Sequence, residues 1–304
     1  RDSCLKSLSM VRKLASRCAA LAIGLLSCLW TSLGEVPWAF CGHGQALRTA
    51  RICCRVGGDV NVISFDLDDT LWPVVDVVNA ANCEIAKNHK LLPADEVMNT
   101  MRRIRATPPG ANASYTSLRC QAYEELMGGD RRSAERVVKE WIRARNHAGS
   151  FFLYPDVLGC LESLISTRAI IGAITNGAGS PQDIPKLAPY FSFYVSGEED
   201  AIYPHRKPSP VIFEAAVARA RDLGWTSTLE NWWHVGDDAA TDVAAAARVG
   251  LRTVLLRRPG LSQNRFSVTS AAELAARAAG ADRQPDITVE SLSGLADKIA
   301  QKKK

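Results

Sequence analysis

The stretch "ISFDLDDTLWP", residues 63–73, decides the fold of this chain. Residues 62–65 favour a short buried strand, and Asp66, Asp68 and Asp69 follow it directly. Carboxylates this close repel each other unless a cation or hydrogen bonds compensate their charge. The stretch therefore predicts a strand that ends in a polar site.

Beyond residue 150 the pattern of apolar and polar residues alternates between strand and helix. Predicted strands cover residues 169–175, 191–197, 231–236, 252–256 and 286–289, and predicted helices cover 156–167, 210–224, 240–250 and 291–300. Such alternation is typical of an α/β fold, in which a Rossmann-like parallel sheet carries helices on both faces.

A strand-poor stretch separates the first strand from the second. Helical patterns cover residues 74–89, 94–106, 115–127 and 131–148, with the breakers "LLP", "TPPG" and "GGD" between them. We therefore predict an inserted all-helical cap at residues 74–150. The α/β core then comprises residues 60–73 and 151–304, and residues 1–59 form a leader.

Polar residues also follow the other predicted strands. They are Thr175, Asn176 and Gly177 after one strand, Lys207 just before a helix, and Asp237, Asp238 and Asp242 after another strand. Ligands of open α/β sheets bind at the carboxyl ends of strands. Any one of these residues alone is more often a turn or surface residue, but their joint arrangement favours one site for Mg²⁺ and phosphate.

The motifs "DLDDT", "TNG", "KPSP" and "GDDAATD", in this order and with a helical insert after the first, resemble the haloacid dehalogenase superfamily with a helical cap. The resemblance spans about residues 62–300. Within it, "AITNGAGSP", Pro204-His205 and "HVGDDAATDVAAAARVG" are most similar to bacterial phosphatases acting on FMN and on a phosphorylated ribitylaminouracil.

The resemblance implies a Mg²⁺-dependent phosphomonoester hydrolase. Asp66 would be the nucleophile that forms an aspartyl-phosphate, and Asp68 the general acid and then the general base. Lys207 would neutralise developing charge. Metal ligands would be the Asp66 carboxylate, the Asp68 backbone carbonyl and the Asp237 carboxylate.

The remaining roles follow from the same resemblance. Thr175 and the Asn176 backbone would hold phosphate oxygens, and Asp242 would orient Lys207 or metal-bound water. Asp69 is interpreted as a turn residue. The supporting residues of the predicted site are Thr70, Gly177, Asp238 and Asp242.

Several alternatives remain open. The aspartate at position 68 argues against a dehalogenase, because a halide leaving group needs no proton. A phosphomutase would retain the same motifs, and a non-catalytic binding protein would commonly have lost one of them. Phosphoglycolate and sugar monophosphates are the runner-up substrates after FMN and ribityl phosphates.

Composition and charge describe an ordinary globular body. The chain has 37 Lys/Arg and 32 Asp/Glu, of which eight Lys/Arg and three Asp/Glu lie in residues 1–60. Residues 61–304 therefore have no net charge, and no clustered basic face for nucleic acid is visible in them. From Met10, a basic segment and a 13-residue apolar run form a signal-like pattern, followed by an arginine-containing stretch without acids. We expect a bipartite plastid-targeting leader, with a secretory or mitochondrial leader as the alternative.

We expect a small phosphorylated metabolite as the partner, with no stable membrane association once the leader is removed; the oligomeric state is open. Trp232 and Trp233 are interpreted as packing residues, and His234 is given no catalytic role. Cap residues Arg102, Arg103 and Arg119 are candidates to meet an anionic or planar part of a substrate, but a solvated helix face is the favoured interpretation for each.

Overall fold

A computed structural model of the chain describes residues 61–90, 92–260, 275, 278 and 283–302. The predicted leader lies outside the described residues, so it stays a prediction. Among the helices in these ranges, none combines the length and apolar character that a bilayer crossing requires.

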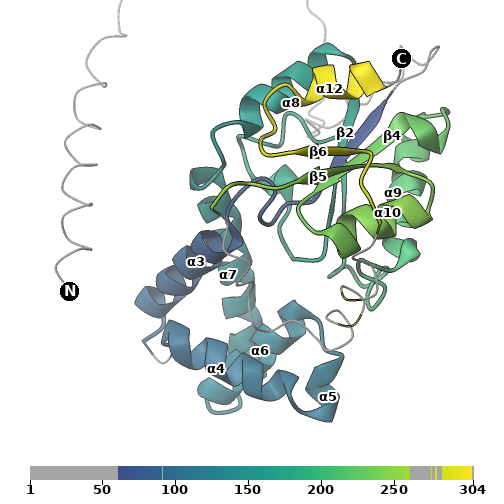
Figure 1. The fold of residues 1–304 in the computed structure, drawn as a ribbon. Helices are drawn as coiled ribbons and strands as arrows, with labels where there is room; N and C mark the ends of the chain where they lie inside the picture. The colour runs from purple at the N-terminus through teal and green to yellow at the C-terminus, as the bar shows by residue number, and fades with distance from the viewer. Residues whose placement is uncertain (1–60, 91, 261–274, 276–277, 279–282, 303–304) are drawn as a thin grey trace, which may run out of the picture. The chain divides into compact units, whose positions relative to one another are not determined.

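Six parallel strands form one sheet in the order β3-β2-β1-β4-β5-β6, which confirms the predicted parallel α/β fold (Figure 1). The strands are β1 (Val62–Phe65), β2 (Ile170–Thr175), β3 (Phe193–Ser196), β4 (Trp232–Gly236), β5 (Arg252–Leu256) and β6 (Ile287–Val289). The central strand β1 is buried along its whole length, as expected for a strand with helices on both faces. In register, Val62 of β1 pairs with Ile170 of β2 and with Trp232 of β4.

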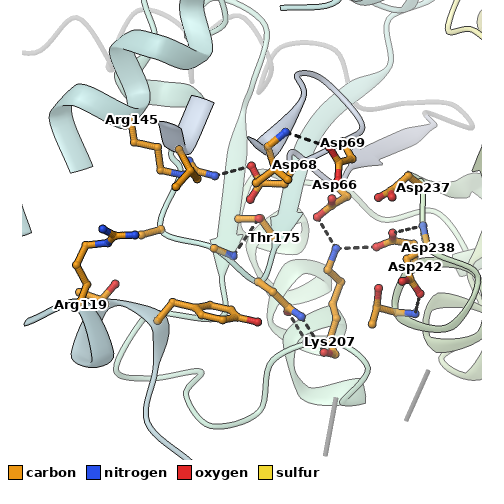
Figure 2. A pocket seen from close by; sticks show the side chains of 18 of the residues that line it. Asp66, Asp68, Asp69, Arg119, Arg145, Thr175, Lys207, Asp237, Asp238 and Asp242 are labelled. Atoms are coloured by element: carbon orange, nitrogen blue, oxygen red, sulfur yellow. Dashed lines mark hydrogen bonds and ion pairs between the residues drawn. The ribbon is translucent and has the colours of Figure 1, made fainter. Parts of the chain in front are cut away.

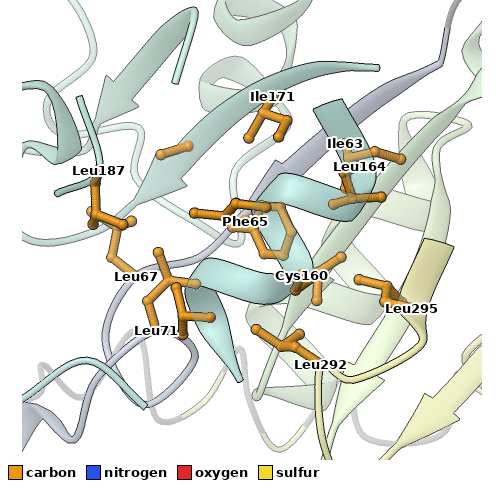
Figure 3. Packing of buried hydrophobic residues seen from close by; sticks show 14 of the residues in the cluster. Ile63, Phe65, Leu67, Leu71, Cys160, Leu164, Ile171, Leu187, Leu292 and Leu295 are labelled. Carbon is orange, nitrogen blue, oxygen red and sulfur yellow. The ribbon is translucent and has the colours of Figure 1, made fainter. Parts of the chain in front are cut away.

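One face of the sheet packs against α8 (Val157–Ser166) and α12 (Leu295–Lys302). Figure 3 shows Phe65 of β1 surrounded by side chains such as Cys160 and Leu164 of α8. Residues of one strand alternate between the faces, so Ile63 and Phe65 belong to this cluster whereas Val62 belongs to the opposite one.

The opposite face packs against α9 (Pro210–Asp222) and α10 (Ala245–Arg248), which lie together in Figure 1. Ser209 begins α9 by accepting a hydrogen bond from the Val211 N–H, and Pro210 suits the first turn because its missing N–H would have no helical partner there. Trp232 and Trp233 are fully buried on opposite faces, which confirms their packing role.

The helices between β1 and β2 are α3 (Val74–Asn88), α4 (Ala94–Arg105), α5 (Pro108–Ala111), α6 (Tyr115–Leu126) and α7 (Arg131–Phe151). They bury an apolar cluster of their own, built from residues such as Val97, Leu118 and Trp141. This arrangement supports the predicted cap. Its exact boundaries at residues 74 and 150 stay a prediction.

Two local predictions were wrong. The "TPPG" breaker contains the short helix α5, because proline fits the first turn of a helix. The helix predicted at 240–250 starts as a π-helical turn at Ala239–Ala244 and only then continues as α10. In this wider turn the Val243 N–H donates to the Asp238 carbonyl five residues back.

Candidate active site

The predicted site residues meet where β2, β1 and β4 end. These strands are neighbours in the sheet, so their carboxyl ends place Thr175, Asp66 and Asp237 side by side. The Asp66 N–H still donates to the Val235 carbonyl at 2.8 Å, which anchors the first aspartate to β4. The sheet topology thus gathers residues that are more than 170 positions apart in the chain.

Lys207 forms the centre of the site. Its Nζ lies 2.6 Å from Asp66 Oδ1 and 2.6 Å from Asp242 Oδ1, and the side chain is almost completely buried. Asn176 holds the lysine backbone at both ends: its Oδ1 accepts from the Lys207 N–H, and its Nδ2 donates to the Lys207 carbonyl. The lysine is therefore fixed in position between two carboxylates (Figure 2).

Burial and charge act in opposite directions on these groups. Burial raises the pKa of Asp66 to about 7, although the charge of Lys207 opposes this shift. Burial also disfavours the charged forms of Lys207 and Asp242, but their mutual attraction is stronger. As a result the pKa of Lys207 is raised and the pKa of Asp242 is lowered, so this pair is ionised at neutral pH.

The π-helical turn directs Asp242 back to the end of β4. Its Oδ2 accepts from the Asp238 N–H at 3.0 Å, and the Asp238 carboxylate accepts from the N–H groups of Ala240 and Thr241. Gly236 makes this approach possible, because a Cβ there would lie 2.2 Å from the Asp242 Cγ.

A divalent cation fits the carboxylates at these strand ends. Oxygens of Asp66, Asp237 and Asp242 all lie within 4.8 Å of one another. Both Asp242 oxygens already accept hydrogen bonds from Lys207 and Asp238, whereas Asp66 Oδ2 accepts none within the described ranges. Asp66 and Asp237 are thus the better placed carboxylates for a hard, oxygen-preferring ion such as Mg²⁺.

Asp68 faces the cap. Its Oδ1 accepts from Trp72 Nε1 at 2.8 Å and from Arg145 Nη2 of α7 at 2.5 Å. Its Oδ2 accepts no hydrogen bond from the residues that the structure describes, and lies 3.1 Å from the position that a Cβ on Gly177 would take. The carboxyl group is therefore held by one oxygen and presents the other to the loop after β2.

The next two residues shape the turn. Asp69 has a positive φ of 60°, and its Oδ1 accepts from the Val74 N–H at the start of α3, which agrees with a turn role. Thr70 braces the turn through its carbonyl, which accepts from Arg258 Nη2 at 2.9 Å, whereas its buried hydroxyl has no partner within the described ranges.

His234 belongs to a buried chain of hydrogen bonds. Trp232 Nε1 donates to Ser64 Oγ, Ser64 Oγ lies 2.9 Å from His234 Nδ1, and His234 Nε2 lies 3.3 Å from Asp242 Oδ1. Burial lowers the pKa of His234. The neutral ring can therefore support Asp242 from behind, which fits the expectation that it has no direct catalytic role.

A pocket of about 180 Å³ lies between these strand ends and the cap helices. Its core side includes Asp66, Thr175 and Lys207, and its cap side includes Arg119 and Arg145. The interpretation of Arg119 as part of a solvated face was therefore wrong. Arg102 and Arg103 are exposed, as expected.

Sequence reasoning gave substrate contact by Arg119 only as the weaker alternative and did not single out Arg145, because arginine is mostly a surface residue. A signal was present, since Arg145 falls in the apolar stripe of its helix with Val138, Trp141 and Ala148. Arg119 similarly lies beside Leu118 and one turn before Tyr123, which are both buried. The second role of Asn176, holding the backbone of Lys207, had no local signal.

Residues 60–250 match the family of haloacid dehalogenase-like hydrolases. The chain belongs to this family. A curated relative, ribulose-1,5-bisphosphate 5-phosphatase of Halopiger xanaduensis, is 26% identical over 252 residues, which is 78% of this chain and 98% of the relative.

Solved structures of the family agree with the fold. The 2-haloacid dehalogenase of Pseudomonas syringae pv. Tomato is 26% identical, with a TM-score of 0.59 over 80% of this chain and 99% of its own. A HAD hydrolase of Bacillus subtilis bound to magnesium is 14% identical, with a TM-score of 0.52 over 79% of this chain and 98% of its own, and this likeness concerns the fold alone.

Proposed function

We propose that this hydrolase cleaves phosphomonoesters in a Mg²⁺-dependent reaction that proceeds through an aspartyl-phosphate on Asp66. One observation carries the proposal: Lys207 is fixed between Asp66 and Asp242, while Thr175 and Asp68 border the same pocket. A nucleophile, a fixed cation and a proton donor thus surround one space large enough for a phosphoryl group.

Asp66 and Asp237 would hold the metal, with the Asp68 carbonyl as the predicted backbone ligand. A bound Mg²⁺ would supply charge stabilisation for the phosphoryl oxygens. Asp242 is better explained as a positioning residue, because both of its oxygens accept hydrogen bonds from Lys207 and Asp238. This division agrees with the roles that the motif resemblance implies.

In the first step an Asp66 carboxylate oxygen attacks phosphorus, and the bond from phosphorus to the ester oxygen breaks. Asp68 gives its proton to the leaving alkoxide, so that an alcohol departs. Lys207 and the Thr175 hydroxyl stabilise the negative oxygens of the transferred group. The contacts from Trp72 and Arg145 to Oδ1 favour Oδ2 as the oxygen that carries this proton.

In the second step Asp68, now ionised, takes a proton from water. The resulting hydroxide attacks phosphorus, the bond from phosphorus to Asp66 breaks, and inorganic phosphate leaves. Asp66 is thereby restored as a carboxylate and Asp68 as a carboxylic acid. Arg145 supports this step by holding the Asp68 carboxyl group in place through its hydrogen bond to Oδ1.

Dehalogenation is the second candidate, favoured by the 26% identity to a 2-haloacid dehalogenase. Departure of a halide requires no proton donor, and Asp68 with its two fixed hydrogen bonds supports phosphoester cleavage instead. The relative named as a phosphatase of ribulose bisphosphate supports the same reaction class. FMN and ribityl phosphates, suggested by the motifs, join phosphoglycolate and sugar phosphates as candidate substrates.

A release assay tests the proposal. Phosphate release from a panel of these phosphomonoesters and 4-nitrophenyl phosphate is measured with Mg²⁺ and with EDTA, and chloride release from 2-chloropropionate is measured in parallel. We expect Mg²⁺-dependent phosphate release that falls at least about a thousandfold in Asp66→Asn. The matched control Asp222→Asn changes an exposed aspartate of α9 and retains activity.

Four outcomes would contradict the proposal. Full phosphate release by Asp66→Asn would exclude the covalent mechanism. Chloride release without phosphate release would establish the dehalogenase. Interconversion of sugar phosphates that depends on a bisphosphate would establish a mutase, and a folded protein inactive in every assay would indicate a binding role.

A further inference from the structure

Arg119 of α6 is a buried cation without a carboxylate partner among the described residues. Its side chain is only 4% exposed, and its guanidinium lies 3.7 Å from the centre of the Trp141 ring. Its hydrogen bonds within the described ranges all come from Nη1, which donates to Asn82 Oδ1 at 3.0 Å and to the Tyr123 hydroxyl at 3.4 Å. All three of these neighbours are neutral.

Such an arrangement is unfavourable in the absence of a ligand. Moving an unpaired charge out of water is costly, and cation–π contact with a tryptophan offsets only part of that cost. Burial lowers the pKa of Arg119, but a guanidinium stays charged at any physiological pH. A buried charge of this kind is expected where an anion completes the pair.

The pocket supplies the place for that anion. Arg119 borders the same pocket as Asp66 and Thr175, and Figure 2 shows it below Arg145 on the cap side of the site. Of the two guanidinium groups on the cap side, Arg145 already contacts the Asp68 carboxyl group, whereas Arg119 has no acidic partner among the described residues. The remaining positive charge lies on Arg119.

The geometry points to Arg119 as the receptor of a second anionic group, a carboxylate or a second phosphate, on the phosphomonoester substrate. This assignment rests on the proposed function and narrows it. The phosphoryl group lies at Asp66, and the second anion lies at the other end of the pocket, with its apolar stem beside cap residues such as Val78 and Met101. Phosphoglycolate and sugar bisphosphates have such a group, whereas FMN has none.

Matched substrate pairs test the assignment. 2-Phosphoglycolate is compared with 2-hydroxyethyl phosphate for the carboxylate, and propane-1,3-diol bisphosphate with 3-hydroxypropyl phosphate for the second phosphate. We expect the wild-type enzyme to prefer the member with the second anion in at least one pair, by about 10- to 100-fold in kcat/KM, the factor typical of a hydrogen bond to a charged group. The pair with the larger preference identifies the anion.

Arg119→Met should reduce this preference to near unity. Arg103→Met is the matched control, because it removes an exposed arginine of the cap that pairs with Glu125, and it should keep the wild-type preference. A preference that survives in folded Arg119→Met would overturn the assignment. Equal kcat/KM for both members of both pairs in the wild-type enzyme would overturn it as well.

Asn82→Asp provides a second test that needs no loss of a side chain. Asn82 Oδ1 already accepts a hydrogen bond from Arg119, and aspartate has the same shape as asparagine. An aspartate at position 82 therefore gives Arg119 a carboxylate partner within the protein. We expect the substrate preference to fall and the melting temperature of the ligand-free protein to rise. A purely structural role for Arg119 would leave the preference unchanged in this variant.

Binding separates failure of this assignment from failure of the proposed function. Affinities of the same pairs for the Asp66→Asn protein are measured by calorimetry, which requires no turnover. Preferential binding of the anionic members, lost in Asp66→Asn/Arg119→Met, supports the second-anion site even where phosphate release fails. Equal binding of both members excludes it, whatever the chemistry.

Discussion

Replacing Lys207 by methionine removes the cation between Asp66 and Asp242 while keeping a side chain of similar length. Both carboxylates lie 2.6 Å from the lysine Nζ, and all three side chains are almost completely buried. The variant therefore leaves two like charges close together in the protein interior. Removing one partner of a buried ion pair costs about 3–5 kcal/mol, because the other charge loses its compensation.

The expected loss is measurable by urea unfolding at pH 8 with EDTA. In a thermal melt of a domain of this size, a loss of about 3–5 kcal/mol in the free energy of unfolding corresponds to a melting temperature lower by about 6–20 °C. The matched control is Lys186→Met, since Lys186 is exposed, donates to the Ser150 carbonyl and lies 6.0 Å from the centre of the Phe151 ring, with no acidic partner among the described residues. We expect the control to change the free energy of unfolding by less than about 0.5 kcal/mol.

The cost should depend on pH. Without Lys207 the folded-state pKa of Asp66, already raised to about 7, rises further, and the pKa of Asp242 is no longer held low by the lysine charge, so both exceed the unfolded value of about 3.9. The native variant then binds more protons than the unfolded chain, so its free energy of unfolding falls as pH rises from about 4 through the raised pKa values. The difference from the wild type should therefore be smaller at pH 5 than at pH 8.

The double variant Lys207→Met/Asp242→Asn removes one of the two unpaired charges and should recover a large part of the loss. Stability of Lys207→Met equal to wild type at pH 8 would refute the view that this lysine holds the site together. A cost of the same size at pH 5 and pH 8 would show that lost packing, and not charge, is responsible.

Three further predictions concern the chemistry and the strand ends. Because the pKa of the metal-free Asp66 is raised to about 7, a metal must displace the Asp66 proton at low pH. Calorimetry should therefore find Mg²⁺ binding about tenfold weaker at pH 6 than at pH 8. An affinity independent of pH would contradict this expectation. Asp68→Asn should slow hydrolysis of alkyl phosphates by about 100- to 10,000-fold. With 4-nitrophenyl phosphate the variant should still show a burst of 4-nitrophenolate, because this leaving group needs no proton. The absence of a burst in rapid mixing would count against the proton-donor role. Gly236→Ala should displace Asp242 and reduce phosphate release, because the added Cβ would lie 2.2 Å from the Asp242 Cγ. The added Cβ of the control Gly159→Ala in α8 meets nothing within 4 Å, so this variant should keep its activity. Equal activity of the two variants would refute the close-approach argument.

Sequence periodicity could predict the parallel sheet and the helical insert because both depend on local patterns. β1 is a buried four-residue strand, and α7 carries its apolar residues at helical spacing, so each is readable from a short window. The π-helical turn at 239–244 was not readable in this way. It depends on hydrogen bonds that the Asp238 carboxylate and carbonyl accept from the N–H groups of Ala240 and Val243, which compete with the ordinary helical pattern.

For the site, the sequence by itself determined which chemical groups stand at the ends of the strands. Asp66, Thr175 and Asp237 could be named from motifs, since Thr175 is the last residue of its strand and the two aspartates directly follow theirs. Only the tertiary structure decided how these groups are paired. Lys207 forms ion pairs with both Asp66 and Asp242, whereas Arg119 is buried without a carboxylate partner within the described ranges. These pairings arise because side chains far apart in the chain compete for the same neighbours. No local pattern encodes that competition, and it is what gives the pocket an unpaired positive charge.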